Sequence, residues 1–262
     1  MANKKYIHGF TKKERQRLLD QGELLASLVY PGVELGKCRS ILEVGSGVGA
    51  QTLQLLKRFP KAHVTCIEHS EEQLKTARLK LERPLREGRV TLIHASAERM
   101  PLKSKAFDGV FVCWLLEHVP APVAVLKEIR RVLKKDGSLF IREVFNQLWY
   151  ADPPNPKLTA YWQSFNDCQL KLGGDPYVGV KLGGLLKDVG FKEIEIEFRS
   201  QLFDRRDRVK RAAMMNYWRD LFLSGQNASP AMKKQIRTQF ETLKKDPSGS
   251  LFFGFVAGQA RM

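Results

Sequence analysis

Strand-like apolar runs alternate with helical segments through the first half of the chain, and this pattern most constrains the fold. The strand-like runs lie at 40–47, 63–68, 89–95, 107–114 and 137–144, and helical spacing occurs at 50–59, 71–82 and 122–134. Consecutive strand–helix–strand units join parallel strands by right-handed crossovers. We therefore expect an α/β fold with a parallel sheet at its centre.

The segments on either side of this alternation follow other patterns. A capping-box sequence at Thr11–Glu14 opens an expected amphipathic helix over 11–29. Beyond residue 145 we expect a helix at 179–189, a strand at 191–198, two or more helices within 204–245 with a break at Asn227–Pro230, and a closing strand at 250–258. These later segments are expected to cover one edge of the sheet, so that residues 1–262 form a single domain.

The composition is ordinary for a globular protein, with 43% hydrophobic and 27% charged residues. No apolar run approaches the roughly 18 residues of a membrane span, and the basic N-terminus lacks the apolar core of a signal peptide. The four cysteines are far apart and form no CxxC pair. We therefore expect a cytoplasmic protein without a membrane span, a metal site or a disulfide framework.

The charge is unusual, because 44 Lys and Arg residues face 28 Asp and Glu residues, which gives a net charge of +16. The excess is spread over segments 1–20, 74–89 and 201–247 and forms no single basic stripe. Such a charge fits either a solvated surface or a polyanionic partner, so nucleic acid remains an alternative partner.

A glycine-rich turn follows the first strand of the alternation, in LEVGSGVGAQT. Gly45, Gly47 and Gly49 would let the backbone approach a ligand closely, and the N-terminus of the next helix attracts negative charge. Glu68 ends the second strand, where a carboxylate can accept hydrogen bonds from both hydroxyls of a ribose. These features alone fit NAD and S-adenosylmethionine (SAM) equally.

Three further stretches distinguish the two cofactors: VTCIEHSEEQLKTAR, ASAERMPLKSKAFDGVFVCWLLEHV and LKEIRRVLKKDGSLFI. In this order, after the glycine turn, they resemble class I SAM-dependent methyltransferases over roughly residues 38–145. The resemblance is to the branch that includes the ubiquinone and menaquinone C-methyltransferases. It implies a Rossmann-like seven-stranded sheet with helices on both faces. It also implies an N-terminal arm and helix at 1–36, a SAM-binding core at 38–145, a substrate-side lid at 146–190 and a helical insertion at 200–248.

The resemblance also assigns the cofactor, SAM, with S-adenosylhomocysteine as its product and no metal. The methionine part is expected at Glu43, Gly45, Ser46, Gly47 and Gly49. The ribose is expected at Glu68, and the adenine at His69, Ser96 and Ala97. Cys113 and Trp114, at the end of the fourth strand, are expected beside the reactive sulfonium.

The acceptor side is less determined by the sequence. His118 follows the fourth strand and is the candidate general base, with a structural histidine as the alternative. Tyr6 and His8 belong either to a segment that closes over the cofactor or to a basic tail. The aromatic side chains Trp149, Tyr150 and Tyr177 either line a substrate pocket or form the core of a lid.

Asp152-Pro-Pro154 matches the first three residues of a motif of adenine methyltransferases. However, it follows the fifth strand instead of the fourth, and Asn155 stands where the motif has an aromatic residue, so we do not interpret it as that motif.

We predict in-line methyl transfer to a small aromatic or apolar acceptor. The alternatives are an RNA methyltransferase and a SAM-binding protein without transfer activity. The acceptor atom and the oligomeric state stay open.

Overall fold

A computed structural model describes residues 6–225 and 228–262. Its strands are β1 (Ser40–Val44), β2 (His63–Glu68), β3 (Val90–His94), β4 (Phe107–Cys113), β5 (Leu133–Glu143), β6 (Trp149–Asp152), β7 (Lys192–Phe203) and β8 (Ser250–Arg261). Its helices are α1 (Lys12–Leu24), α2 (Ala26–Val29), α3 (Ala50–Arg58), α4 (Glu71–Lys80), α5 (Glu82–Arg86), the 3-10 helix η1 (Leu116–His118), α6 (Pro122–Val132), α7 (Pro156–Lys171), α8 (Val178–Val189), α9 (Arg208–Ser224) and α10 (Pro230–Lys245).

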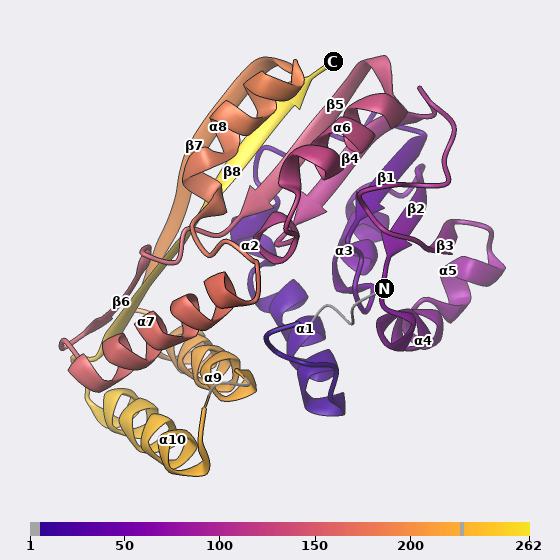
Figure 1. The fold of residues 1–262 in the computed structure, drawn as a ribbon. Coiled ribbons are helices and arrows are strands. Elements are labelled where there is room, and N and C mark those ends of the chain that lie inside the picture. The colour runs from indigo at the N-terminus through magenta and orange to yellow at the C-terminus, as the bar shows by residue number, and fades with distance from the viewer. Residues whose placement is uncertain (1–5, 226–227) are drawn as a thin grey trace.

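The strands form one sheet in the order β3-β2-β1-β4-β5-β8-β6, and β7 pairs with β8. Strands β1 to β5 are parallel, as the alternation predicts. Strand β8 runs antiparallel to its neighbours. It pairs with β7 along most of its length, and on its other side with β6 near its start and β5 near its end. The fold is therefore α/β and Rossmann-like, and its sheet has a long antiparallel extension (Figure 1).

The expected count of seven strands is wrong within the described part of the chain, which contains eight. The additional strand is β6, where Trp149 and Ala151 are buried while Tyr150 and Asp152 are exposed. Four residues in an aromatic, Pro-rich stretch are too short for an alternating pattern to stand out. Strand β7 also continues to Phe203, five residues beyond the expected end at 198.

The expected helix over 11–29 is divided at Leu25 into α1 and α2. Helices α5 and α7 were not expected from the sequence. In α7, Pro156 occupies the first turn and the side chain of Asn155 accepts a hydrogen bond from the Leu158 backbone N–H, at 3.1 Å. The two expected helices within 204–245 are α9 and α10. Asn227, in the expected break between them, lies outside the described residues.

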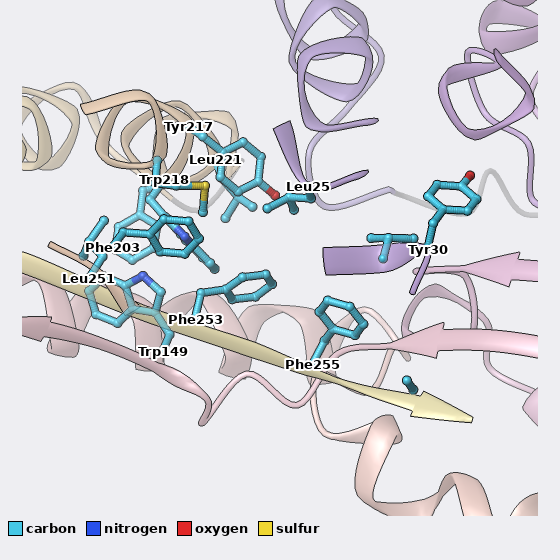
Figure 2. Close-up of a cluster of buried hydrophobic side chains, with 14 of the residues drawn as sticks. Leu25, Tyr30, Trp149, Phe203, Tyr217, Trp218, Leu221, Leu251, Phe253 and Phe255 are labelled. Atoms are coloured by element: carbon cyan, nitrogen blue, oxygen red, sulfur yellow. The ribbon is translucent and has the colours of Figure 1, made fainter. Parts of the chain in front are cut away.

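Two hydrophobic cores lie on opposite faces of the sheet. In β1, Ile41 contributes to the core shared with α2 and α3, whereas Leu42 contributes to the core shared with α6 and α8. The first core continues into the cap, which we define as α7, α9 and α10 (Figure 1). Figure 2 shows Trp149 and Phe253 from the strands facing Trp218 of α9. The cap is thereby fixed to the sheet by large aromatic side chains.

None of the helices among the described residues is long and apolar enough to cross a bilayer.

Candidate active site

The glycine-rich turn joins β1 to α3 in a backbone conformation that side chains disfavour. Gly45, Gly47 and Gly49 have φ angles of 78°, 55° and 82°. A Cβ atom on Gly47 would lie 2.7 Å from Oε1 of Gln73, and one on Gly45 would lie 2.8 Å from Cδ1 of Leu115. Glycine is therefore needed here both for the turn and for the space beside it.

Glu68, at the end of β2, is only 5% exposed and is held against this turn. Its Oε2 accepts the Gly47 backbone N–H at 2.9 Å, and its Oε1 accepts the Ser70 backbone N–H at 2.8 Å. His69 Nδ1 lies 3.0 Å from Oε1. A carboxylate oxygen can accept more than one hydrogen bond, so Glu68 is oriented by the backbone and can still accept from a ligand.

The turn after β4 approaches the glycine turn from the neighbouring strand. Trp114 has a φ of 53°, which is uncommon for a bulky residue. Glu143, at the end of β5, accepts the backbone N–H groups of Leu115 and Leu116 at 3.1 and 2.8 Å. Burial, reinforced by Glu117, raises the pKa of Glu143 to about 8. Glu143 was missed from the sequence, although an acidic residue in the apolar run LFIREV is a signal for a structural role.

One cleft connects these two turns with the first helix and the cap. Its polar and charged lining residues beyond the predicted set are Arg17, Gln21, Gln51, Gln73, Glu117 and Asn146. Its additional apolar and aromatic lining residues are Leu18, Val48, Ala50, Leu115, Val144, Trp162, Phe165, Tyr217, Trp218, Leu221 and Phe253. The cleft thus has a polar end at the glycine turn and an aromatic end below the cap.

The aromatic end, which we call the aromatic chamber, is walled by Trp162 and Phe165 of α7, Tyr217 and Trp218 of α9, and Phe253 of β8. The Trp162 and Phe165 rings stack with centroids 5.1 Å apart, and the Trp218 ring meets Trp162 edge-on at 5.4 Å. The Trp162 indole N–H donates to the Asn146 carbonyl at 2.8 Å. These contacts fix the ring orientations before any ligand enters.

The segment before α1 folds over the mouth of the cleft. The Tyr6 ring lies 5.0 Å from the His118 ring, and the His8 ring lies 5.3 Å from Phe165. The Tyr6 hydroxyl donates to Glu14 at 3.3 Å, and Glu14 pairs with Arg17 at 2.7 Å. Burial, and to a lesser extent the negative charge of Glu14, raises the pKa of Tyr6 well above its usual value.

The structure brings ten of the predicted site residues into the cleft lining: Tyr6, His8, Gly45, Ser46, Gly47, Glu68, His69, Cys113, Trp114 and His118. Seven others do not line it: Glu43, Gly49, Ser96, Ala97, Trp149, Tyr150 and Tyr177.

Three of these seven are buried in the interior of the fold and contribute to its structure. Glu43 lies beneath the turn, where its Oε2 accepts the Thr52 hydroxyl at 2.6 Å. Gly49 approaches Leu81 and caps α3. Trp149 packs in the core against Phe222, with ring centroids 5.2 Å apart.

The other four lie at or near the surface. Ser96 is exposed, and its hydroxyl accepts the Glu98 backbone N–H at 3.2 Å, while Ala97 packs at the edge of the second core. Tyr150 is 50% exposed, and Tyr177 meets Phe145 edge-on.

The residues of α1 and α9 that line the cleft were missed. Their side chains follow ordinary helical spacing, and only the packing of α1 against α9 brings them to the same cleft.

Three buried polar atoms in the lining have no hydrogen-bond partner within the described residues: Ser46 Oγ, Trp114 Nε1 and Trp218 Nε1. Leaving a buried donor unpaired costs about 1–3 kcal/mol. All three atoms belong to residues that line the cleft. In the described part of the chain, no cluster of three His, Cys, Asp or Glu side chains could hold a metal ion.

Residues 42–141 match the family described as a methyltransferase domain. The ubiquinone/menaquinone biosynthesis C-methyltransferase of Syntrophotalea carbinolica is 29% identical over 148 residues, covering 56% of this chain and 55% of that protein. The 2-methyl-6-phytyl-1,4-hydroquinone methyltransferase of Spinacia oleracea is 30% identical over 159 residues, covering 56% and 45%. The chain thus spans about half the length of these curated relatives.

Solved structures share the fold over most of the chain. A crystal structure of a protein described as a methyltransferase from Bacillus halodurans covers 90% of this chain and 97% of its own, with a TM-score of 0.60 and 20% identity. A geranyl diphosphate C-methyltransferase from Streptomyces coelicolor covers 92% and 78%, with a TM-score of 0.56 and 15% identity. At these identities the likeness shows the architecture alone.

Proposed function

We propose, from the premise that residues 42–141 form a class I SAM-dependent methyltransferase domain, that the chain transfers a methyl group from SAM to a small aromatic or apolar acceptor. One observation carries this proposal. A single cleft joins the glycine turn and Glu68 to the aromatic chamber. A cofactor at the first end and an acceptor at the second would share one water-poor space.

The residues at the polar end fit SAM. A side chain at Gly45 or Gly47 would collide with Leu115 or Gln73, so glycine lets the turn lie close to the cleft, and Glu68 presents an oriented carboxylate for the ribose hydroxyls. Ser46 lies within the turn and also lines the cleft. Bound SAM would supply a methyl group on a positively charged sulfur, which is a reactive donor for displacement.

The residues of the chain then have to align the acceptor and exclude water. Transfer to a well-placed nucleophile gains chiefly from proximity and orientation. The stacked rings of Trp162 and Phe165 would hold a flat apolar acceptor, and the Trp218 indole N–H would donate to its polar substituent. Tyr6 and His118 touch across the mouth of the cleft and would close it.

The names of the curated relatives support the same class of acceptor. The Syntrophotalea protein is named for ubiquinone and menaquinone biosynthesis, and the Spinacia protein for a hydroquinone. We therefore propose a phenolic or quinol-like ring as the acceptor class. Of the alternatives, the net charge of +16 favours RNA, whereas the buried aromatic walls favour a small ring.

The test is a transfer assay with methyl-labelled SAM against a panel of hydroquinones, phenols and total cellular RNA. We expect label in a small aromatic product, and we expect Glu68→Ala to weaken S-adenosylhomocysteine binding by about 1.5–3 kcal/mol. Label in RNA alone would identify an RNA methyltransferase. Saturable binding without any labelled product would identify a SAM-binding protein without transfer activity.

Two proposals about organisation accompany this function. The segments 1–36, 146–190 and 200–248 act as parts of one catalytic domain with the core at 38–145, and the protein works in the cytoplasm. Limited proteolysis that releases a separately stable fragment would contradict the first. Cell fractionation tests the second.

A further inference from the structure

The segment before α1 places a histidine at the junction between the cap and the turn after β4. His8 lines the cleft, and its ring lies 5.3 Å from Phe165 of α7 and 6.4 Å from His118 of η1. The ring also meets Tyr6 edge-on with centroids 5.2 Å apart, and its Nδ1 lies 2.6 Å from Oγ of Ser224, the last residue of α9. The ring is therefore held between three elements that are distant in the sequence.

The hydroxyl of Ser224 determines which ring nitrogen carries the proton. A serine hydroxyl has one hydrogen, and in Ser224 this hydrogen is donated to the Leu221 carbonyl at 2.7 Å. The short contact to His8 is then a hydrogen bond in which Nδ1–H donates and Oγ accepts. Neutral His8 consequently carries its lone pair on Nε2, which has no hydrogen-bond partner among the described residues.

The charged groups around His8 favour the neutral ring. Arg17 and Glu14 of α1, Glu117 and His118 of η1, Tyr217 of α9 and Tyr6 are the titratable groups near it. Burial lowers the pKa of His8 well below its usual 6.5, and Arg17 and His118 lower it further. Of the nearby acids, Glu14 is paired with Arg17 at 2.7 Å, and Glu117 lies 3.6 Å from Nε2 of His118.

We propose that His8 is the general base of the transfer and that Nε2 accepts the proton of the acceptor. This rests on the proposed function and assigns to His8 the role that sequence analysis gave to His118. The O–H or C–H bond of the acceptor breaks and its proton goes to Nε2. The freed electron pair forms the bond to the methyl carbon, and the electrons of the carbon–sulfur bond remain on sulfur in neutral S-adenosylhomocysteine. The proton then leaves His8 for solvent.

The first test compares three single variants with the wild type in the transfer assay. His8→Asn keeps a donor toward Ser224 but removes the base, so kcat should fall about 10²- to 10⁴-fold while KM for SAM changes less than threefold. His63→Asn is the matched control, because His63 lies on β2, bonds Thr91 and does not line the cleft. It should react at the wild-type rate.

His118→Asn separates the two histidines. In the wild type, kcat/KM should rise with pH along a titration whose midpoint lies below pH 6.5. The reason is that His8 is neutral, and so active as a base, once the pH exceeds its lowered pKa. Removing His118 removes a neighbour that lowers the pKa of His8, so the rise should move to higher pH and remain present. A rise that persists in His8→Asn but disappears in His118→Asn would overturn the proposal.

A measurement on the wild type avoids dependence on folding of the variants. Nitrogen chemical shifts of the histidines, with S-adenosylhomocysteine bound, should show the His8 proton on Nδ1 and a pKa below 6.5. A proton on Nε2, or more than a tenth of wild-type kcat in a folded His8→Asn, would overturn the assignment while leaving the methyltransferase function intact. Absence of transfer by the wild type would instead contradict the proposed function, and the base assignment with it.

Discussion

At the scale of single residues, the cleft is built from groups whose conformation or burial is costly without a ligand. Trp114, a bulky residue, adopts a positive φ of 53° just after β4. Ser46 and Trp218 bury polar atoms without partners within the described residues. Strain and unpaired donors of this kind gather at functional sites, where binding compensates for them.

The first prediction concerns the glycine turn. Gly47→Val should abolish measurable S-adenosylhomocysteine binding in calorimetry, because the side chain would fill the space beside Gln73. Gly88→Val is the matched control. Gly88 has a similar φ of 67° with no atom near the added Cβ, so it carries the backbone strain of roughly 1–2 kcal/mol without blocking the cleft. Equal loss of affinity in both variants would mean that backbone strain, and not a side chain that blocks the glycine turn, explains the effect.

The second prediction concerns Glu43. Burial raises its pKa to about 8 from an unfolded value near 4.5, so the folded protein binds the extra proton between these values. The contribution of Glu43 to stability is therefore fully present below pH 4.5 and is lost as the pH rises through about 8. Between these values the free energy of unfolding falls by up to about 1.4 kcal/mol per pH unit. Urea unfolding from pH 5 to 8 should show this decline, and Glu43→Gln should make it shallower. The same slope in Glu43→Gln as in the exposed control Glu34→Gln would refute the assignment.

At the scale of elements, the acceptor end of the cleft depends on how the cap meets the sheet. Strand β8 extends beyond β5 to pair with β6 and β7, and its extension carries Phe253 beneath α9. Figure 2 shows Trp218 of α9 extending toward Phe253 of this strand, while the Tyr217 hydroxyl lies beside Leu25. Helix α9 of the insertion before β8 therefore forms one wall of the aromatic chamber, opposite residues of α7.

The third prediction uses two tryptophans of this wall. Trp218→Phe keeps an aromatic ring and removes the unpaired N–H in the chamber, so KM for the acceptor should rise about 5- to 30-fold while S-adenosylhomocysteine affinity stays unchanged. Trp149→Phe is the matched control, since its N–H is equally buried and unpaired among the described residues but does not line the cleft. Equal effects of the two substitutions on KM would show that general packing is responsible.

At the scale of the whole molecule, local patterns predicted the parallel core and the polar end of the cleft. The turn at Gly45–Gly49 and Glu68 at the end of β2 are both encoded within short segments of sequence. The aromatic chamber could not be predicted in this way. Its residues come from α7, α9 and β8, and their meeting depends on the pairing of β6 with β8 and on the packing of the cap. For the same reason Tyr150, from the aromatic stretch after β5, is exposed while Trp218 lines the cleft.

The central claim is that one cleft holds the cofactor at its glycine end and the acceptor at its aromatic end. A crystal structure of the protein with S-adenosylhomocysteine tests it most directly. We expect the homocysteine part beside Gly45 and Gly47, the ribose hydroxyls hydrogen-bonded to Glu68, and the sulfur between Cys113 and the aromatic chamber. Binding of the nucleoside elsewhere, such as in the groove between α7 and α10 lined by Tyr161 and Ile236, would contradict the claim.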